Sequence, residues 1–373
     1  MTGVQTACQG MKVLMTVDAV GGVWRYAMDL AAGLRILGVE TAFICFGSAP
    51  SAAQAAEAQQ IGALHVCDLP LDWMVDNEAA LHGVTGAIEH YAAVERADLI
   101  HLNLPSQAAR LRTNIPVVAV GHSCVCTWFK AVRDDHAPKN WQWHFELNRQ
   151  GFDRADAVVM PSESHARLST EVYGEIKGLR VVHNGTCLPE VSGQKENYVF
   201  AAGRWWDDGK NGAALDAAAG GLDWPVVMAG SNRGPNRQFL QLLNVDHRGE
   251  LDHSETMALM RQAAIVVSPS LYEPFGLAVL EAARSASAMV LADIPTYREL
   301  WSGTALFADP NSKEAFAAAI SRLVHDKELR KRLGGLAQAR SRAFTVEAQA
   351  ASVRAIYRHV LSIVQAPTAM EYT

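Results

Sequence analysis

One stretch of the sequence combines residue types that recognise sugars or anions. It runs E-P-F-G-x-x-x-L-E from Glu273 to Glu281. Proline and glycine interrupt the chain there, and the pattern predicts a helix that begins near Leu277. The first N–H groups of a helix have no partner within it. Those of Phe275, Gly276 and Leu277 are therefore available to hold an anion or sugar hydroxyls.

Two carboxylates frame this stretch. Glu273 lies just before the predicted helix, and Glu281 lies about two turns further along on roughly the same face. A carboxylate accepts hydrogen bonds from adjacent hydroxyls, so the pair suits recognition of a polyol. The alternative is a helix-capping Glu273 and a solvated Glu281, because surface glutamates are common.

A second candidate is the loop G-R-W-W-D-D-G-K-N at 203–211, which carries two cations. Arg204 stands at the end of a predicted strand and Lys210 follows a glycine, so both side chains can reach a diphosphate. Such charge-assisted contacts stabilise a departing nucleoside diphosphate without a metal ion. The alternative is two solvated charges, since Arg and Lys are mostly exposed.

Two further positions follow predicted strands in the first half of the chain. Gly21 and Gly22 lie between the first strand and the first helix, but they lack the G-x-G-x-x-G pattern of a dinucleotide site. A tight strand-to-helix turn is an equal alternative for this pair. His122 ends a predicted strand at 116–123, a position that faces a cleft, although a lone histidine is more often structural.

Apolar runs that read as buried strands alternate with helical patterns along the chain. These runs are 12–17, 39–46, 98–103, 116–123, 156–162 and 180–185, then, after a polar linker at 188–197, 198–203, 225–231, 264–270, 289–293 and 305–310. Such alternation predicts parallel sheets covered by helices on both faces. Ligands of two such domains bind at the carboxyl ends of the strands, in the cleft that the domains share.

We predict a first domain at 11–187, a second at 198–344 and a last helix at 345–364. The apolar residues of this last helix recur at helical spacing, so one face needs a partner: Val353, Ile356, Tyr357, Val360 and Val364. Residues 1–10 have neither periodicity nor the pattern of a signal peptide, and we interpret them as a dispensable leader.

The composition argues against several classes of protein. With 49% hydrophobic and 19% charged residues, the 373-residue chain is not a disordered one. A net charge of −6 gives no reason to expect nucleic acid. No apolar run approaches the ~20 residues that span a bilayer. Six scattered cysteines indicate a reducing compartment, so we expect a cytoplasmic location.

Three motifs of common α/β enzymes are missing from the sequence. It contains no D-x-D, no G-x-S-x-G and no P-loop. Transferases that hold a diphosphate through a divalent cation typically need paired carboxylates, so the missing D-x-D favours a metal-free mechanism.

Two other segments have more than one interpretation. The segment 126–152 carries Trp128 and two further tryptophans among basic residues, which is typical of an acceptor pocket or of a packing face. Ser254 is predicted to cap the helix near 249–260.

The string from Glu273 to Glu281 resembles the E-x7-E motif of retaining glycosyltransferases of family 4. The loop at 203–211 resembles the family's G-R-x-x-x-x-K-G/N segment, although Trp205 and Trp206 are bulkier than usual. The likeness implies the GT-B fold, in which two Rossmann-like doubly wound domains face each other across a cleft. It also implies that the last helix crosses back to the first domain.

The resemblance further implies roles for individual residues. Glu273 would contact the donor sugar, Glu281 the nucleotide ribose, and the N–H groups of 275–277 the sugar hydroxyls. Gly21 and Gly22 would face the donor diphosphate and the acceptor. His122 would contact the donor sugar or its phosphate.

We therefore predict a retaining, metal-independent hexosyltransferase that needs no cofactor. It would move a sugar from a UDP- or GDP-sugar to a hydroxyl acceptor such as a glycan, a lipid or a small molecule. Its predicted catalytic residues are Glu273, Arg204, Lys210 and His122. We expect no nucleic-acid partner, and peripheral membrane contact is not indicated. Two alternatives stay open: a sugar-nucleotide epimerase on the same architecture, and a degenerate nucleotide-sugar-binding subunit.

Overall fold

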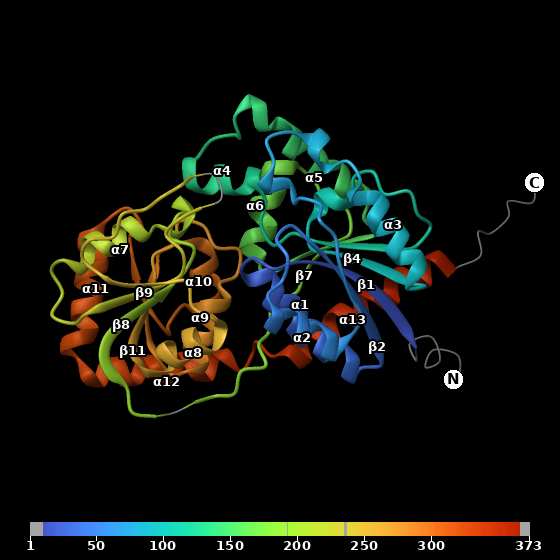
Figure 1. The fold of residues 1–373 in the computed structure, drawn as a ribbon. Helices are drawn as coiled ribbons and strands as arrows, with labels where there is room; N and C mark the ends of the chain where they lie inside the picture. Colours follow the sequence, from blue (N-terminus) through green and yellow to red (C-terminus); the bar gives the residue numbers. More distant parts are fainter. Residues whose placement is uncertain (1–9, 192, 235–236, 366–373) are drawn as a thin grey trace, which may run out of the picture.

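Two parallel β-sheets organise the chain (Figure 1). The computed structural model describes residues 10–191, 193–234 and 237–365, so the predicted leader lies outside them apart from Gly10. The first sheet has seven strands in the order β3-β2-β1-β4-β5-β6-β7, and the second has six in the order β10-β9-β8-β11-β12-β13. All paired strands run parallel. The predicted pair of Rossmann-like domains is confirmed, and we call them the first and second domains.

The strands of the first sheet are β1 (Met11–Asp18), β2 (Val39–Phe46), β3 (Leu64–Val66), β4 (Leu99–Leu102), β5 (Val117–Val120), β6 (Ala157–Met160) and β7 (Leu179–Val181). Those of the second are β8 (Glu196–Ala202), β9 (Val226–Ala229), β10 (Asp246–Gly249), β11 (Ala263–Ser268), β12 (Ala288–Ala292) and β13 (Leu306–Ala308). Strands β3 and β10 were not predicted, because each is a short edge strand without a buried apolar run.

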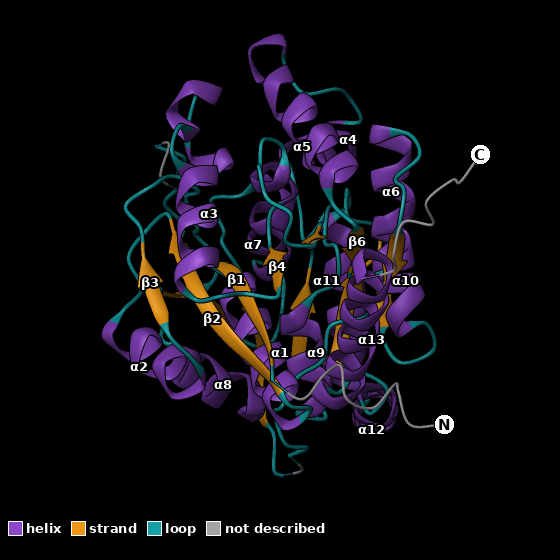
Figure 2. Cartoon of the chain, turned by 90° about the vertical axis from the view of Figure 1, so that its right-hand side faces the viewer, coloured by secondary structure: helices purple, strands orange, loops and turns teal. Residues whose placement is uncertain are grey.

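Helices lie on both faces of the sheets, as Figure 2 shows for the first domain. The first half of the chain forms α1 (Gly22–Ile36), α2 (Ala52–Ile61), α3 (Val84–Val94), α4 (Val125–Arg133), α5 (Gln142–Arg154) and α6 (Glu163–Tyr173). The second half forms α7 (Gly212–Ala219), α8 (His253–Gln262), α9 (Leu277–Arg284), α10 (Pro295–Trp301), α11 (Lys313–His325), α12 (Lys327–Ser341) and α13 (Val346–Gln365). Single turns of 3-10 helix are η2 (Asp72–Met74), η3 (Glu78–Leu81), η4 (Pro105–Ala108), η5 (Lys139–Trp141) and η6 (Asp208–Lys210).

The cap of α8 differs from the prediction. Asp252, not Ser254, is the N-cap residue, and its carboxylate accepts a hydrogen bond from Glu255 N at 2.8 Å. Ser254 donates its hydroxyl to the same carboxylate oxygen at 2.7 Å. Asp competes well with Ser for an N-cap, and the capping box with Glu255 favours the earlier start.

The last helix, α13, packs against the first domain rather than the second. It lies beside α1, from which it is far removed along the chain (Figure 1). Val353, Tyr357 and Val360 are buried in the core that α1 and β1 also build. The Tyr357 hydroxyl lies 2.7 Å from Nδ1 of His101 on β4. The side chain of Val364, predicted for the same face, lies outside the described side chains.

The chain passes between the domains twice, and the two passages touch. Thr186 forms a parallel bridge with Thr345, and Thr186 N donates to Phe344 O at 3.3 Å. A Cβ at Gly185 would lie 2.3 Å from the carbonyl carbon of Thr345, so only glycine fits this close approach. The two crossings between the domains, near Thr186 and Thr345, are therefore paired with each other.

Candidate active site

The glycine pair of the first domain lies against the second domain. Gly21 precedes α1 with a φ of +82°, which favours glycine. A Cβ at Gly21 would lie 3.8 Å from Arg204 Nη1, and one at Gly22 would lie 3.6 Å from Leu277 Cδ1. The fold thus brings together three segments that the sequence singled out: the glycine pair, the 203–211 loop and the start of α9.

Lys210 and Glu273 form an ion pair. Their Nζ and Oε2 atoms are 2.6 Å apart, and both side chains are mostly buried. The alternatives of a solvated Lys210 and a helix-capping Glu273 are therefore wrong, because α9 begins after Gly276 and the glutamate meets the lysine instead. The pair places the Lys210 ammonium, which can donate three hydrogen bonds, next to the Glu273 carboxylate, which accepts them.

Arg204 is the more exposed of the two cations. Its guanidinium lies over the Trp206 ring at 5.5 Å and 3.8 Å from an Asp207 carboxylate oxygen. The bulky Trp205 of this loop is buried in the core of the second domain, where its Nε1 donates to Ala229 O at 2.8 Å. Trp205 therefore does not occupy the space between Arg204 and the glycine pair.

Asp18 is a site residue that the sequence analysis missed. It is the last residue of β1, three positions before Gly21, and it is buried. Burial raises its pKa to about 6, while a hydrogen bond from Val20 N and the charge of Arg204 act in the opposite direction. Its place at the carboxyl end of a buried strand was the available signal.

The start of α9 offers backbone donors. Gly276 is its N-cap residue with a φ of +89°, and among the described residues no side chain caps this end. A Cβ at Gly276 would lie 3.0 Å from Tyr297 and 3.3 Å from Glu273 Cγ. The Phe275 ring is buried in the core, so only its backbone can serve a ligand. The helix begins at Leu277, as predicted.

Glu281 is buried, so the alternative of a solvated glutamate is wrong. Its side chain is 7% exposed. Burial, together with the negative charge of Asp29, raises its pKa to about 8 against the opposing charge of Arg25. Asp29 and Arg25 belong to α1, so the second glutamate of the motif faces the first domain.

His122 follows β5 and takes part in a polar network at the edge of the first sheet. Its Nε2 lies 2.8 Å from Asn103 Oδ1, and its ring packs edge-on against Tyr26. Burial lowers its pKa to about 3, with the neighbouring His101 contributing. The imidazole is therefore neutral near pH 7, and it offers a hydrogen bond rather than a positive charge.

The same network includes residues without a signal in the sequence. Asn103 N and Thr16 Oγ1 are 2.9 Å apart, and the Thr16 hydroxyl donates to Gln107 Oε1 at 2.7 Å. Gln107 also lines a cavity of about 460 Å³ in the first domain. Its other walls come from the segments around 70–72, 78–85 and 104–110, and they are mainly apolar.

The described residues contain neither a candidate metal site nor a candidate membrane-spanning helix. Within the described ranges, no three His, Cys, Asp or Glu side chains gather as a metal site would require. None of the helices in that part of the chain has both the length and the apolar character needed to cross a bilayer.

Two family models match nearly the whole described chain. "Glycosyltransferase Family 4" matches residues 20–188, and "Glycosyl transferases group 1" matches residues 194–340. Among curated relatives, D-inositol 3-phosphate glycosyltransferase of Corynebacterium glutamicum is 32% identical over 149 residues, which are 37% of this chain and 36% of the relative. Glycogen synthase of Mycobacterium tuberculosis is 35% identical over 94 residues, 25% of this chain and 23% of the relative. The matched stretches thus span well under two thirds of these relatives.

Solved structures match over far more of the chain. Sucrose-phosphate synthase of Thermosynechococcus elongatus has a TM-score of 0.78 at 18% identity, covering 95% of this chain and 100% of that one. HepE of Anabaena, solved with UDP-glucose, has a TM-score of 0.72 at 18% identity, covering 94% and 100%. At such identities the likeness shows the fold. With the two family models, it shows that this chain belongs to the glycosyltransferases of the family 4 type, which have the GT-B fold.

Proposed function

We propose that the protein transfers a sugar from a nucleoside diphosphate sugar to a hydroxyl-bearing acceptor, with retention of the anomeric configuration. The observation that carries the proposal is the meeting of Arg204, the start of α9 and the glycine pair between the domains. Lys210 and Glu273, which form an ion pair, belong to the two segments of the second domain at this place: the 203–211 loop and the residues before α9. HepE, a structural neighbour, was solved in complex with UDP-glucose, which supports a donor of this class.

The second domain supplies the groups that would hold the donor. Arg204, Lys210 and the N–H groups at the start of α9 stabilise negative charge on the departing diphosphate. Glu273 accepts hydrogen bonds from the sugar, and the buried Glu281 meets the ribose hydroxyls. The bond from the anomeric carbon to the diphosphate oxygen breaks, and one to the acceptor oxygen forms on the same face. The departing phosphate takes the acceptor proton.

The first domain supplies the acceptor side. The cavity of about 460 Å³ has the size of a small-molecule site. Gln107 on its wall connects through Thr16 and Asn103 to His122, which follows β5 at the edge of the sheet. A neutral His122 accepts or donates a hydrogen bond without repelling or attracting charge. We assign this edge of the first domain to the acceptor.

A panel of UDP-, GDP- and ADP-sugars tests the proposal. The protein should release the nucleoside diphosphate from one of them faster in the presence of an acceptor. NMR of the early product should show an α-linkage from an α-donor, and an inverted product would refute retention. Donor converted to another sugar nucleotide without an acceptor would indicate the epimerase instead. Tight donor binding without turnover would indicate a non-catalytic subunit.

A further inference from the structure

Both neighbours of Glu273 are hydrogen-bonded to the first domain. The Tyr272 hydroxyl lies 2.8 Å from Thr127 Oγ1, and Thr127 is fully buried. On the other side, the Ser162 hydroxyl donates to the carbonyl oxygen of Pro274 at 2.7 Å. The proposed sugar-binding glutamate therefore stands between two fixed points that belong to α4 and to the N-cap of α6.

The loop that carries Lys210 is attached to the same helix. Trp128 of α4 donates its Nε1–H to Asp207 Oδ1 at 2.9 Å, and Gly209 N donates to the same oxygen at 2.8 Å. A Cβ at Gly209 would lie 2.7 Å from the Trp128 nitrogen, so the indole and the loop are in close contact. Arg133, at the end of α4, pairs with Asp208. In Figure 1, α4 lies where the two domains meet.

The two loops are also bonded to each other. Leu271 N and Tyr272 N donate to the carbonyl oxygen of Gly209, at 2.9 and 3.3 Å. With the Lys210–Glu273 ion pair, these bonds join the segments 207–210 and 271–274 into one unit. Movement of α4 relative to the second domain would therefore act on both charged side chains at once.

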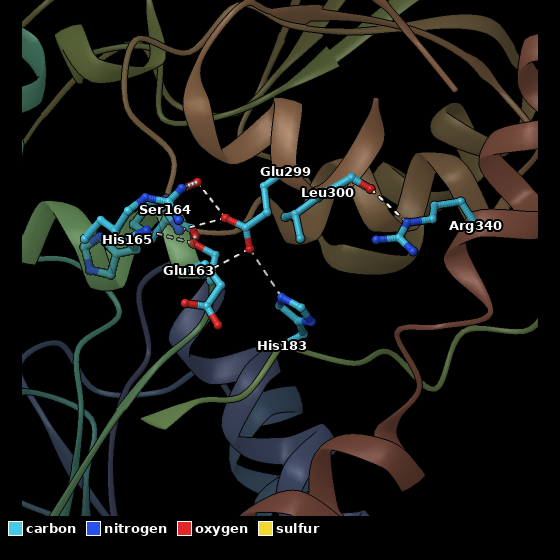
Figure 3. Close-up of polar contacts among 10 residues, drawn as sticks. Glu163, Ser164, His165, His183, Glu299, Leu300 and Arg340 are labelled. Atoms are coloured by element: carbon cyan, nitrogen blue, oxygen red, sulfur yellow. Dashed lines mark hydrogen bonds and ion pairs between the residues drawn. The ribbon is translucent and has the colours of Figure 1, made fainter. Parts of the chain in front are cut away.

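A third contact between the domains joins α10 to the two residues that follow Ser162, without involving either loop. Figure 3 shows Glu299 of α10 at the N-terminus of α6, where it accepts hydrogen bonds from Glu163 N at 3.0 Å and Ser164 N at 2.7 Å. Burial alone would raise the pKa of Glu299, but bonds from His183 and Ser164 lower it to about 2. This contact joins the domains without touching the segment 271–274.

We propose that Thr127, Trp128 and Ser162 are positioning residues for sugar transfer. The first domain, when it closes on the second, fixes Glu273 and Lys210 relative to the donor through these three side chains. The inference rests on the proposed function, in which those two residues act on the donor. Displacements of about 1 Å cost transfer reactions up to about 100-fold in rate, so such contacts are large enough to matter.

Thr127→Val is the sharpest single test, because it removes the hydroxyl and keeps the shape of the side chain. Both hydroxyls also serve a helix start, Ser162 as the N-cap of α6 and Thr127 in the capping box of α4 with Cys124. The melting temperature of each variant is therefore measured beside its kcat. Thr127→Val should lower kcat about tenfold, equal to about 1.4 kcal/mol, with donor KM changed less than about threefold. Thr127→Ser should restore most of the rate. An unchanged kcat in Thr127→Val would overturn the proposal.

A double mutant with Glu273→Gln tells whether Thr127→Val lowers kcat through Glu273 or by destabilising the protein as a whole. If Thr127 acts through Glu273, then Thr127→Val should change kcat less than about twofold in a Glu273→Gln background. The same tenfold loss in both backgrounds would contradict the proposal. The matched control is Glu299→Gln, which weakens the other contact between the domains. It should lower the melting temperature and keep kcat within about twofold; a loss equal to that of Thr127→Val would show that any loosening of the domains suffices.

Hydrogen exchange gives a readout that needs no turnover. In the full-length protein, amides in 271–276 should exchange faster in Thr127→Val than in the wild type, because the segment loses one of its fixed points. Unchanged exchange overturns the proposal whatever the activity. A wild type that turns over no donor, with faster exchange in the variant, overturns the proposed function and leaves the positioning contact supported.

Discussion

Glu273 and Glu281 stand at the two ends of one motif, yet their surroundings differ. Glu273 pairs with a lysine of its own domain, and its neighbours along the chain are bonded to α4 and α6. Glu281 is buried against α1, where the nearest charges include another carboxylate, Asp29. The comparison teaches that one motif can place the same residue type in two environments: Glu273 is part of an ion pair, whereas Glu281 is buried with its pKa raised to about 8.

Substitutions of the cations near Glu273, Lys210 and Arg204, should have the largest effect on kcat. Charge grows on the diphosphate as the glycosidic bond breaks, so the cations at this end of the motif interact most strongly in the transition state. Lys210→Ala should lower kcat about 10²–10³-fold with little change in donor KM, and Arg204→Ala should behave likewise. Arg204→Lys should restore little if the contact is bidentate. Steady-state kinetics with one donor decide this; kcat values within about threefold for both alanine variants would refute the assignment.

The other end of the motif should affect binding instead. Contacts to the ribose persist through the reaction, so their loss weakens ground state and transition state equally. Glu281→Ala should raise donor KM about tenfold, or about 1.4 kcal/mol, at nearly constant kcat. Titration calorimetry with the nucleoside diphosphate alone should show the same loss of affinity. A kcat defect as large as that of Lys210→Ala would remove the distinction between the two ends.

The burial of Glu281 also predicts a dependence of stability on pH. Its folded pKa, about 8, is above the ordinary value of 4.5. The contribution of protonated Glu281 to the free energy of unfolding is thus fully present below pH 4.5, and it is lost as the pH rises through 8. Glu281→Gln does not titrate, so its melting temperature should rise relative to wild type between pH 5 and 9, by roughly 2–4 °C per kcal/mol.

An exposed glutamate provides the control for this measurement. Glu40 is exposed near the start of β2, and Glu40→Gln is the reference for loss of a surface glutamate in the same melting experiment. A flat difference between Glu281→Gln and wild type would mean that Glu281 is already ionised in the folded protein.

Chelation should have the smallest effect. If Arg204 and Lys210 carry the charge of the diphosphate, activity should survive excess EDTA unchanged within about twofold. Loss of activity with EDTA and recovery with Mg²⁺ or Mn²⁺ would show that the two cations are not sufficient.

The local signals in the sequence predicted most of the fold. Buried strands of a parallel sheet are continuous apolar runs, and β2 at 39–46 was therefore found at its observed bounds. The edge strands β3 and β10 are half-exposed, so they lack this signal. The cap of α8 was misplaced by two residues because Asp252 and Ser254 both suit an N-cap.

The site was predictable only where its residues lie in one motif or at a strand end. Glu273, Lys210 and the start of α9 follow strands, and the fold brings these positions together. The burial of Glu281 was not predictable, because it depends on α1, more than 200 positions away along the chain. The bond from Thr127 to Tyr272 spans 145 positions and has no periodicity to reveal it.

The position of α13 has a consequence for the order in which the protein is completed during synthesis. Translation adds about 5–20 residues per second, so roughly 10–40 s pass between β7 and the last helix. During that interval α1 lacks the covering residues Val353, Tyr357 and Val360. The second domain takes all of its strands from one continuous stretch, β8 to β13. The first domain, although it is translated first, thus cannot complete its core until the last helix has been made.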